Sequence, residues 1–223
     1  MRLMQLLLKK GAFSEYKLKK DETANLPLFR EDAIKIIVDN LNDSDIIVST
    51  TGVASRELFE YREELKQGHE KDFLTVGGMG HANQIALGIA LQKPNRRVFC
   101  LDGDGAALMH MGSMAINGNI ECDNFKHIIF NNGAHDSVGG QPTVGYTTDF
   151  QSIAKASGYN LVLQAETNEE IVKYIEDLKA LEGKVFLEVK VKKGFRKDLG
   201  RPTTTPKENK QNLMGFIKES YHE

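Results

Sequence analysis

The sequence contains no tryptophan, only two cysteines and only five prolines. Cys100 lies in an apolar run and Cys122 lies beside acidic residues. We therefore expect both to be reduced structural thiols, as in a cytoplasmic protein. A metal-binding cysteine pair is not expected.

Long apolar runs are also missing. No stretch approaches the roughly 20 apolar residues that span a bilayer, so no membrane partner is expected. Residues 1–10 contain a basic residue and several leucines, but this stretch is too short for the apolar core of a signal peptide. The formal net charge of -2 gives no reason to expect nucleic acid as a partner. Any recognition of an anion must therefore be local.

What remains is the composition of a globular protein. The 223 residues, 40% hydrophobic and 27% charged, are enough for one α/β domain with tails. Residues 1–29 are rich in lysine and turn formers and are interpreted as a linker. We expect the domain to cover residues 30–195, and residues 196–223 to form a basic extension with a terminal helix.

Apolar periodicity alternates between strand and helix along the domain. Strands are predicted at residues 45–50, 73–76, 97–102, 126–131, 160–164 and 184–190, and the helices between them include one from about 106 to 118. A later helix has Thr167 as its expected N-cap and Ile171, Ile175 and Leu178 on one face. This order predicts an α/β fold with a doubly wound, mainly parallel sheet and helices on both faces. Ligands of such folds lie at the carboxyl ends of the strands.

Two loops after predicted strands carry oxygen-bearing side chains. Gly-Asp-Gly occupies 103–105, Asn-Asn-Gly occupies 131–133, and the 25 residues from 106 to 130 separate them. A helix and a returning strand fit this interval and would bring the Asp104 carboxylate and an asparagine amide to adjacent strand ends, where they suit Mg2+. An ordinary turn and an unrelated asparagine pair would leave the same pattern. Leu108 excludes a dinucleotide fingerprint, and no P-loop sequence is present.

These two loops and their spacing resemble the thiamine diphosphate signature of the decarboxylase superfamily. The resemblance implies thiamine diphosphate and Mg2+ as cofactors. It implies that Asp104 and Asn132 are side-chain ligands of Mg2+ and that Ala134 is a carbonyl ligand. It also implies that the diphosphate lies beside Gly103, Gly105 and Ala106.

Two further loops resemble parts of the same cofactor site. In the family, a loop like 77–80 binds the aminopyrimidine: Gly77 and Gly78 would approach it, and Met79 would hold the cofactor bent. A plain core methionine is an equal reading of Met79 alone. Thr51 and Gly52 resemble the early loop that reaches the diphosphate, although a simple turn would look the same.

Three longer runs, at 49–58, 131–143 and 198–210, resemble the phosphonopyruvate decarboxylases. The resemblance implies decarboxylation of 3-phosphonopyruvate to phosphonoacetaldehyde and CO2, a step of phosphonate biosynthesis. A β-type subunit of sulfopyruvate decarboxylase is the near alternative. A non-catalytic module that binds thiamine diphosphate and holds partner domains together is an alternative of another class.

Several residues near these runs are candidates for substrate contact. His135 and Ser137 could face the 2-keto acid, His135 as a proton donor, although a structural role fits each equally well. His110, which lies among methionines, is interpreted as helix packing. The basic residues at 196, 197 and 201 and the threonines at 203–205 suit a phosphonate dianion. A solvated tail, or a bridge to a partner subunit, fits that composition at least as well.

The glutamate that activates the cofactor's pyrimidine in this family lies on a separate pyrimidine-binding domain. The resemblance implies that residues 1–29 are the linker from such a missing N-terminal domain. We therefore expect the active site to form only against a pyrimidine-binding domain or subunit, in an oligomer. The isolated chain is expected to be inactive.

Overall fold

The computed structural model describes residues 7, 9–12, 14 and 25–219, so most of the predicted linker lies outside the described residues. Its main feature is a six-stranded, fully parallel sheet in the order β2-β1-β3-β4-β8-β7. The strands are β1 (Ile46–Ser49), β2 (Asp72–Leu74), β3 (Val98–Gly103), β4 (Phe125–Asn131), β7 (Leu161–Ala165) and β8 (Val185–Lys190). This confirms the predicted α/β fold.

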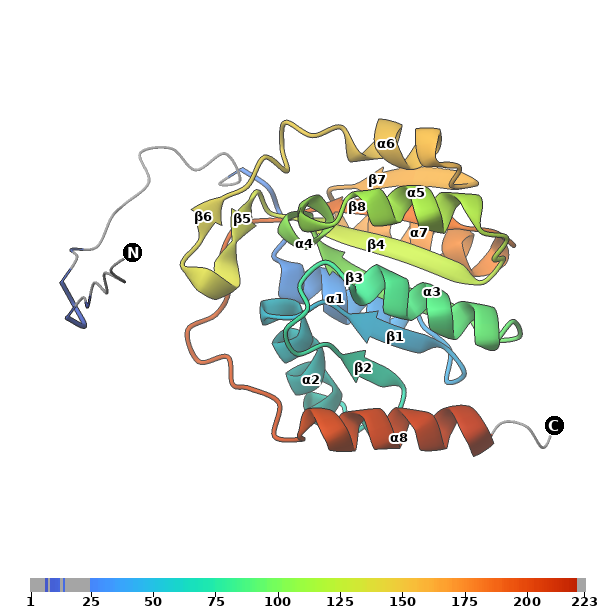
Figure 1. Cartoon of the computed structure of the whole chain (residues 1–223), viewed down its shortest axis with the longest axis horizontal. Coiled ribbons are helices and arrows are strands. Elements are labelled where there is room, and N and C mark those ends of the chain that lie inside the picture. The colour runs from blue at the N-terminus through green and yellow to red at the C-terminus, as the bar shows by residue number, and fades with distance from the viewer. Residues whose placement is uncertain (1–6, 8, 13, 15–24, 220–223) are drawn as a thin grey trace, which may run out of the picture.

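Helices cover both faces of the sheet (Figure 1). On one face lie α1 (Arg30–Asp39), α2 (Val53–Glu64) and α7 (Asn168–Ala180). On the other lie α3 (Ala82–Gln92), α5 (Gly112–Asn119) and α6 (Phe150–Ser157). The short α4 (Asp104–Met109) begins where β3 ends. None of the described helices is long and apolar enough to cross a membrane.

The last helix, α8 (Pro206–Glu219), runs along the edge strand β2 (Figure 1). The buried amide of Asn209 accepts a hydrogen bond from the Leu74 N–H at 3.0 Å and donates one to the Asp72 carbonyl at 2.8 Å. These bonds satisfy backbone groups that an edge strand leaves unpaired. Leu213 and Ile217 join the apolar core. The end of the predicted basic extension is therefore packed on the domain.

Two predictions about the segment 106–118 were wrong. The single helix expected at 106–118 is broken at His110 and Met111, which separate α4 from α5. At this break the chain passes close to Gly80, where an added Cβ would lie 2.7 Å from the Ala106 carbonyl oxygen. His110 is exposed and meets the ring of His81 edge-on at 4.3 Å, so it does not pack inside a helix. The prediction failed because this break is imposed by a neighbouring loop.

Candidate active site

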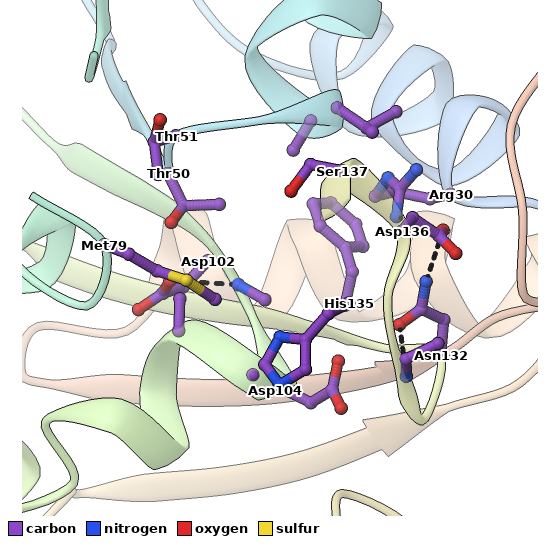
Figure 2. A pocket seen from close by; sticks show the side chains of 17 residues that line it. Arg30, Thr50, Thr51, Met79, Asp102, Asp104, Asn132, His135, Asp136 and Ser137 are labelled. Carbon is purple, nitrogen blue, oxygen red and sulfur yellow. Dashed lines mark hydrogen bonds and ion pairs between the residues drawn. The ribbon is translucent and has the colours of Figure 1, made fainter. Parts of the chain in front are cut away.

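A cleft lies at the carboxyl ends of β1, β3 and β4, where the parallel-sheet rule predicts a ligand site (Figure 2). Its walls combine loops that are far apart in the sequence. The lining residues are Arg30, Thr50, Thr51, Val53, Ala54, Met79, Asp102, Gly103, Asp104, Gly105, Ala106, Phe130, Asn132, Ala134, His135, Asp136 and Ser137.

Asp104, the first residue of α4, is 2% exposed. Burial raises the pKa of its carboxyl group above the usual value, and hydrogen bonds from the Thr143 hydroxyl and from the backbone of Gly105 and Asn132 partly offset this rise. The backbone bond from Asn132 links the loop after β4 to the loop after β3. The structure thus brings the two predicted motifs together around one buried carboxylate.

The amide of Asn132 is fixed at both ends. Its nitrogen donates to Asp136 Oδ2 at 2.6 Å, and its oxygen accepts from the Ala134 N–H at 3.1 Å (Figure 2). This network assigns the orientation of the amide, because the nitrogen faces a carboxylate. Ala134 begins β5 (Ala134–His135), which pairs with β6 (Gln141–Pro142) in a small hairpin over the cleft.

A buried charge cluster supports this hairpin, and sequence reasoning missed it. Asp136 accepts from Arg30 Nη1 at 3.1 Å and from the Gly194 N–H at 3.1 Å. Arg30 also holds Glu57 through two hydrogen bonds of 2.7 and 3.1 Å. Burial raises the pKa of Glu57, and the Arg30 guanidinium partly reverses that rise. Arg30 lies 27 residues from Glu57 and 106 from Asp136, so no local sequence signal could have revealed the cluster.

His135 and Ser137 both line the cleft, His135 half-buried and Ser137 exposed. The His135 ring lies against Gly105, where an added Cβ would be 2.5 Å from Nδ1. The Ser137 hydroxyl lies 3.1 Å from where a Cβ of Gly52 would stand. Both close approaches depend on the absence of a side chain at the glycine.

The early loop and the glycine-rich loop also meet. Thr51 Oγ1 accepts a hydrogen bond from the Gly77 N–H at 3.2 Å, and Met79 reaches the cleft (Figure 2). Gly77 and Gly78 are exposed and do not line the cleft. Gly52 lines a neighbouring cavity. The remaining predicted site residues all line the cleft itself.

The cleft has features that suit an oxyanion and a hard cation. The Thr50 hydroxyl is buried at its wall without a hydrogen-bond partner among the described residues, and an unpartnered buried hydroxyl is unfavourable. A Cβ added at Gly103 would meet no atom within 4 Å, so the backbone there is open to a ligand. Asp104 and Asn132 supply the oxygen atoms that Mg2+ prefers.

Comparison with known proteins identifies the family. Residues 51–189 match the model of the thiamine pyrophosphate enzyme, C-terminal TPP binding domain. The chain belongs to this family. Thiamine pyrophosphate is the same compound as thiamine diphosphate, so the match confirms the resemblance that the sequence motifs carried.

The chain is similar to relatives that are named for two different decarboxylase activities. It is 34% identical over 185 residues to the phosphonopyruvate decarboxylase of Streptomyces viridochromogenes, covering 83% of this chain and 45% of that one. It is 31% identical over 194 residues to the sulfopyruvate decarboxylase subunit beta of Methanococcus maripaludis, covering 87% of this chain and 100% of that one. The chain thus spans less than half of the length of the Streptomyces relative.

Solved structures agree on the fold. The benzoylformate decarboxylase of Polynucleobacter necessarius superposes with a TM-score of 0.64 at 17% identity, covering 86% of this chain and 37% of that one. The thiamine diphosphate-dependent 4-hydroxybenzoylformate decarboxylase of Rhodococcus jostii RHA1 gives 0.62 at 18% identity, covering 80% of this chain and 35% of that one. At these identities the likeness shows a shared fold alone.

Proposed function

We propose that this chain supplies the diphosphate-binding half of the active site of a thiamine diphosphate-dependent decarboxylase that converts 3-phosphonopyruvate to phosphonoacetaldehyde and CO2. The observation that carries this proposal is the meeting of Asp104 with the Asn132 loop in one cleft, in a member of the thiamine pyrophosphate enzyme family. The Streptomyces relatives named phosphonopyruvate decarboxylase support the substrate.

In this proposal Asp104, Asn132 and the Ala134 carbonyl hold Mg2+, which prefers oxygen ligands. Asp136 accepts from the Asn132 amide nitrogen, so the amide oxygen, which also accepts from the Ala134 N–H, would use its second lone pair for the ion. The diphosphate would lie along the backbone of the early loop and of the loop after β3. The residues concerned are Thr51, Gly52, Gly103, Gly105 and Ala106.

The other proposed contacts lie nearer to the reacting atoms. Gly77, Gly78 and Met79 would bind the aminopyrimidine and keep the cofactor bent. When bound, thiamine diphosphate supplies an electron sink for the bond that breaks as CO2 leaves. His135 would hold a proton on a ring nitrogen beside the 2-keto acid, and Ser137 would donate a hydrogen bond to it.

We further propose that the site is completed by a pyrimidine-binding domain or subunit in a cytoplasmic oligomer, and that the chain alone does not turn over substrate. The relatives described as a subunit beta support a separate partner chain. The same relatives favour a second candidate, the β-type subunit of a sulfopyruvate decarboxylase, because this chain covers the whole of one of them. Non-catalytic binding of the cofactor is the third reading.

Cofactor titration followed by a substrate comparison tests the proposal. We expect the chain with its partner to bind thiamine diphosphate in the presence of Mg2+, and Asp104→Asn to weaken that binding at least ~100-fold, since a ligand charge is lost. Asp43→Asn, which removes an exposed carboxylate, is the matched control. Equal binding by Asp104→Asn would contradict the metal site.

The substrate comparison separates the candidate functions. Faster turnover of sulfopyruvate than of phosphonopyruvate would favour the second candidate, and no turnover of either would favour the third.

A further inference from the structure

A second cavity adjoins the cofactor cleft and shares Thr51, Met79 and Ser137 with it. Its empty volume is about 1260 Å³ when the adjoining open solvent is included. Another part of its wall comes from α2, from Arg201, Pro202 and Thr204 just before α8, and from Pro206 and Asn209 in α8. A molecule that reacts beside Met79 and Ser137 could therefore extend into this cavity.

Arg201 stands in the wall of this cavity without a hydrogen bond or ion pair among the described residues. Arg201 and Lys197 are both exposed, but Lys197 does not line the cavity. Arg196 is paired with Glu31 and Glu60. Of the three residues that the sequence grouped together, only Arg201 lies in this wall.

The backbone just before Arg201 is held firmly by α2. Arg56 Nε donates to the Gly200 carbonyl at 2.5 Å, and Arg56 Nη2 donates to the Leu199 carbonyl. Glu60, one helical turn further along, accepts from the Gly200 N–H. The peptide groups on both sides of Gly200 are thus fixed while the Arg201 guanidinium remains unpaired. The backbone that carries Arg201 is therefore fixed beside the cavity, and its exposed side chain is left to pair with an anion there.

We propose that Arg201 binds the anionic group at C3 of the 2-keto acid substrate, a phosphonate or a sulfonate. A guanidinium presents a planar fork of N–H donors that fits two oxygens of such a group. Thr204, three residues after Arg201, also lines the cavity. The 2-keto acid end of the substrate then lies at Met79 and Ser137, beside the cofactor. Arg56 acts as a positioning residue for Arg201. The inference rests on the proposed function.

A kinetic test uses the chain with its pyrimidine-binding partner, loaded with thiamine diphosphate and Mg2+. We expect Arg201→Met to lower the ratio of kcat/KM for phosphonopyruvate to kcat/KM for pyruvate by about 10- to 100-fold, as for loss of a charged hydrogen bond. Pyruvate has no anionic group at C3. Lys210→Met removes the same charge from an exposed site outside the cavity and should leave the ratio unchanged. An unchanged ratio in Arg201→Met would overturn the proposal.

Two further measurements test the role of Arg201 separately from the proposed function. The chain alone is titrated with phosphonoacetate by NMR. Saturable binding that Arg201→Met abolishes and Lys210→Met retains supports the subsite even if no turnover is found. Equal binding by Arg201→Met, or none by the unaltered chain, counts against it. Arg56→Met should raise KM for phosphonopyruvate with kcat nearly constant, whereas a purely structural role would lower the amount of folded protein without changing KM.

Discussion

The two faces of the sheet have different chemistry, although the same strands build both. Toward α1, α2 and α7, side chains such as Phe99, Leu101 and Ile128 are fully buried and apolar. Toward α3, α5 and α6 the strands bury a second apolar cluster, but alternate positions there also carry the polar residues Asp102 and His127, both fully buried. This side is called the polar face below. The apolar face stabilises the domain by burial. The polar face ends at the candidate active-site cleft, because Asp102 lines that cleft.

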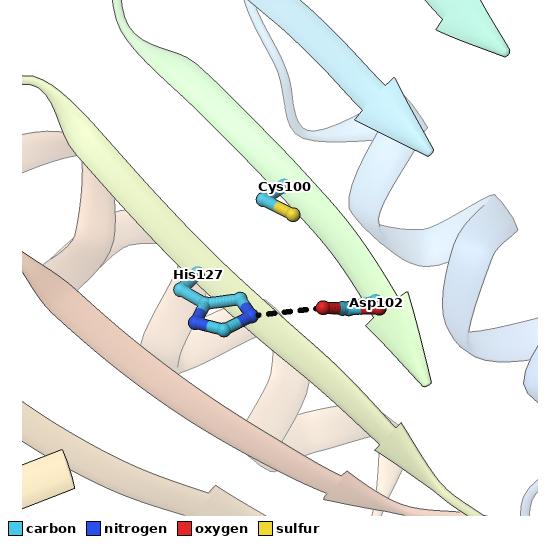
Figure 3. A group of neighbouring side chains, drawn as sticks. All are labelled: Cys100, Asp102 and His127. Carbon is cyan, nitrogen blue, oxygen red and sulfur yellow. Dashed lines mark hydrogen bonds and ion pairs between the residues drawn. The ribbon is translucent and has the colours of Figure 1, made fainter. Parts of the chain in front are cut away.

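The polar side chains of this face form a connected hydrogen-bond network. His127 contacts Asp102 through Nε2 at 3.4 Å and Tyr159 through Nδ1 at 3.0 Å, and the Asn117 amide donates to the Tyr159 hydroxyl at 3.3 Å. Cys100 lies beside Asp102 and His127 (Figure 3). Three potential metal ligands are therefore adjacent, yet both ring nitrogens of His127 are already occupied. Burial raises the pKa of Cys100 well above its usual value, which favours the neutral thiol and agrees with the predicted structural role.

The largest expected effect concerns the apolar face. Phe99→Ala should lower the free energy of unfolding by about 3 to 5 kcal/mol, because it removes a fully buried ring and leaves a cavity. Urea unfolding followed by circular dichroism measures this change. Phe195→Ala, at a ring that is 40% exposed, is the control and should cost far less. Similar losses in the two variants would mean that the apolar face is not the main source of stability.

Lys126 offers a pH test, because it is a buried cation on the apolar face. Its amine donates to the carbonyls of Leu181 and Gly183 at 2.6 and 2.8 Å, and burial lowers its pKa from 10.5 to about 8. Between these two pKa values the unfolded chain binds more protons, so stability should rise with pH across this window, by up to about 3 kcal/mol.

The comparison that isolates this effect is with Lys126→Met, which removes the titrating amine. Urea unfolding of both proteins is measured from pH 7.5 to 10.5, and their difference removes the contribution of other alkaline groups. We expect the unaltered protein to gain stability relative to the variant as the pH rises. A constant difference would show that Lys126 keeps an ordinary pKa in the folded chain.

A smaller effect is expected on the polar face. His127→Leu should cost about 1 to 3 kcal/mol, because it removes one hydrogen-bond partner from buried Asp102 and one from the Tyr159 hydroxyl, which keeps only the bond from Asn117. Tyr159→Phe combined with His127→Leu should cost less than the sum of the two single changes, since the residues share one hydrogen bond. Urea unfolding of the four proteins completes the cycle. Strict additivity would show that the network is not coupled.

The smallest effect concerns a helix end over the apolar face. Thr167 accepts a hydrogen bond from the Glu170 N–H at 3.3 Å, and the Glu170 carboxylate accepts from the Thr167 N–H at 3.1 Å. This capping box was predicted in part, since the sequence indicated Thr167 as the N-cap. Thr167→Ala should cost about 1 kcal/mol of unfolding free energy. Thr167→Ser keeps the hydroxyl and should restore most of it; failure of Ser to do so would attribute the loss to packing of the methyl group.

Local sequence patterns predicted the order of most elements and the strand-end loops. Apolar period and turn residues are local properties, so the strand ending near Asn131 and the helix that follows Thr167 were found close to their observed bounds. The edge strand β2 was extended too far, because the structure ends it at Leu74. The backbone of Asp72 and Leu74 is bound there by Asn209 of α8, a contact that has no local sequence signal.

By itself, then, the sequence determined the α/β class, the two motifs around Asp104 and Asn132, and the family. Tertiary structure alone decided how Arg30, Glu57 and Asp136 are clustered behind those motifs. It also singled out Arg201 within a run of similar basic residues. The physical reason is distance along the chain. Hydrogen bonds that join residues 27, 106 and 144 positions apart have no local periodicity, and they form only when strands and helices from separate parts of the chain pack together.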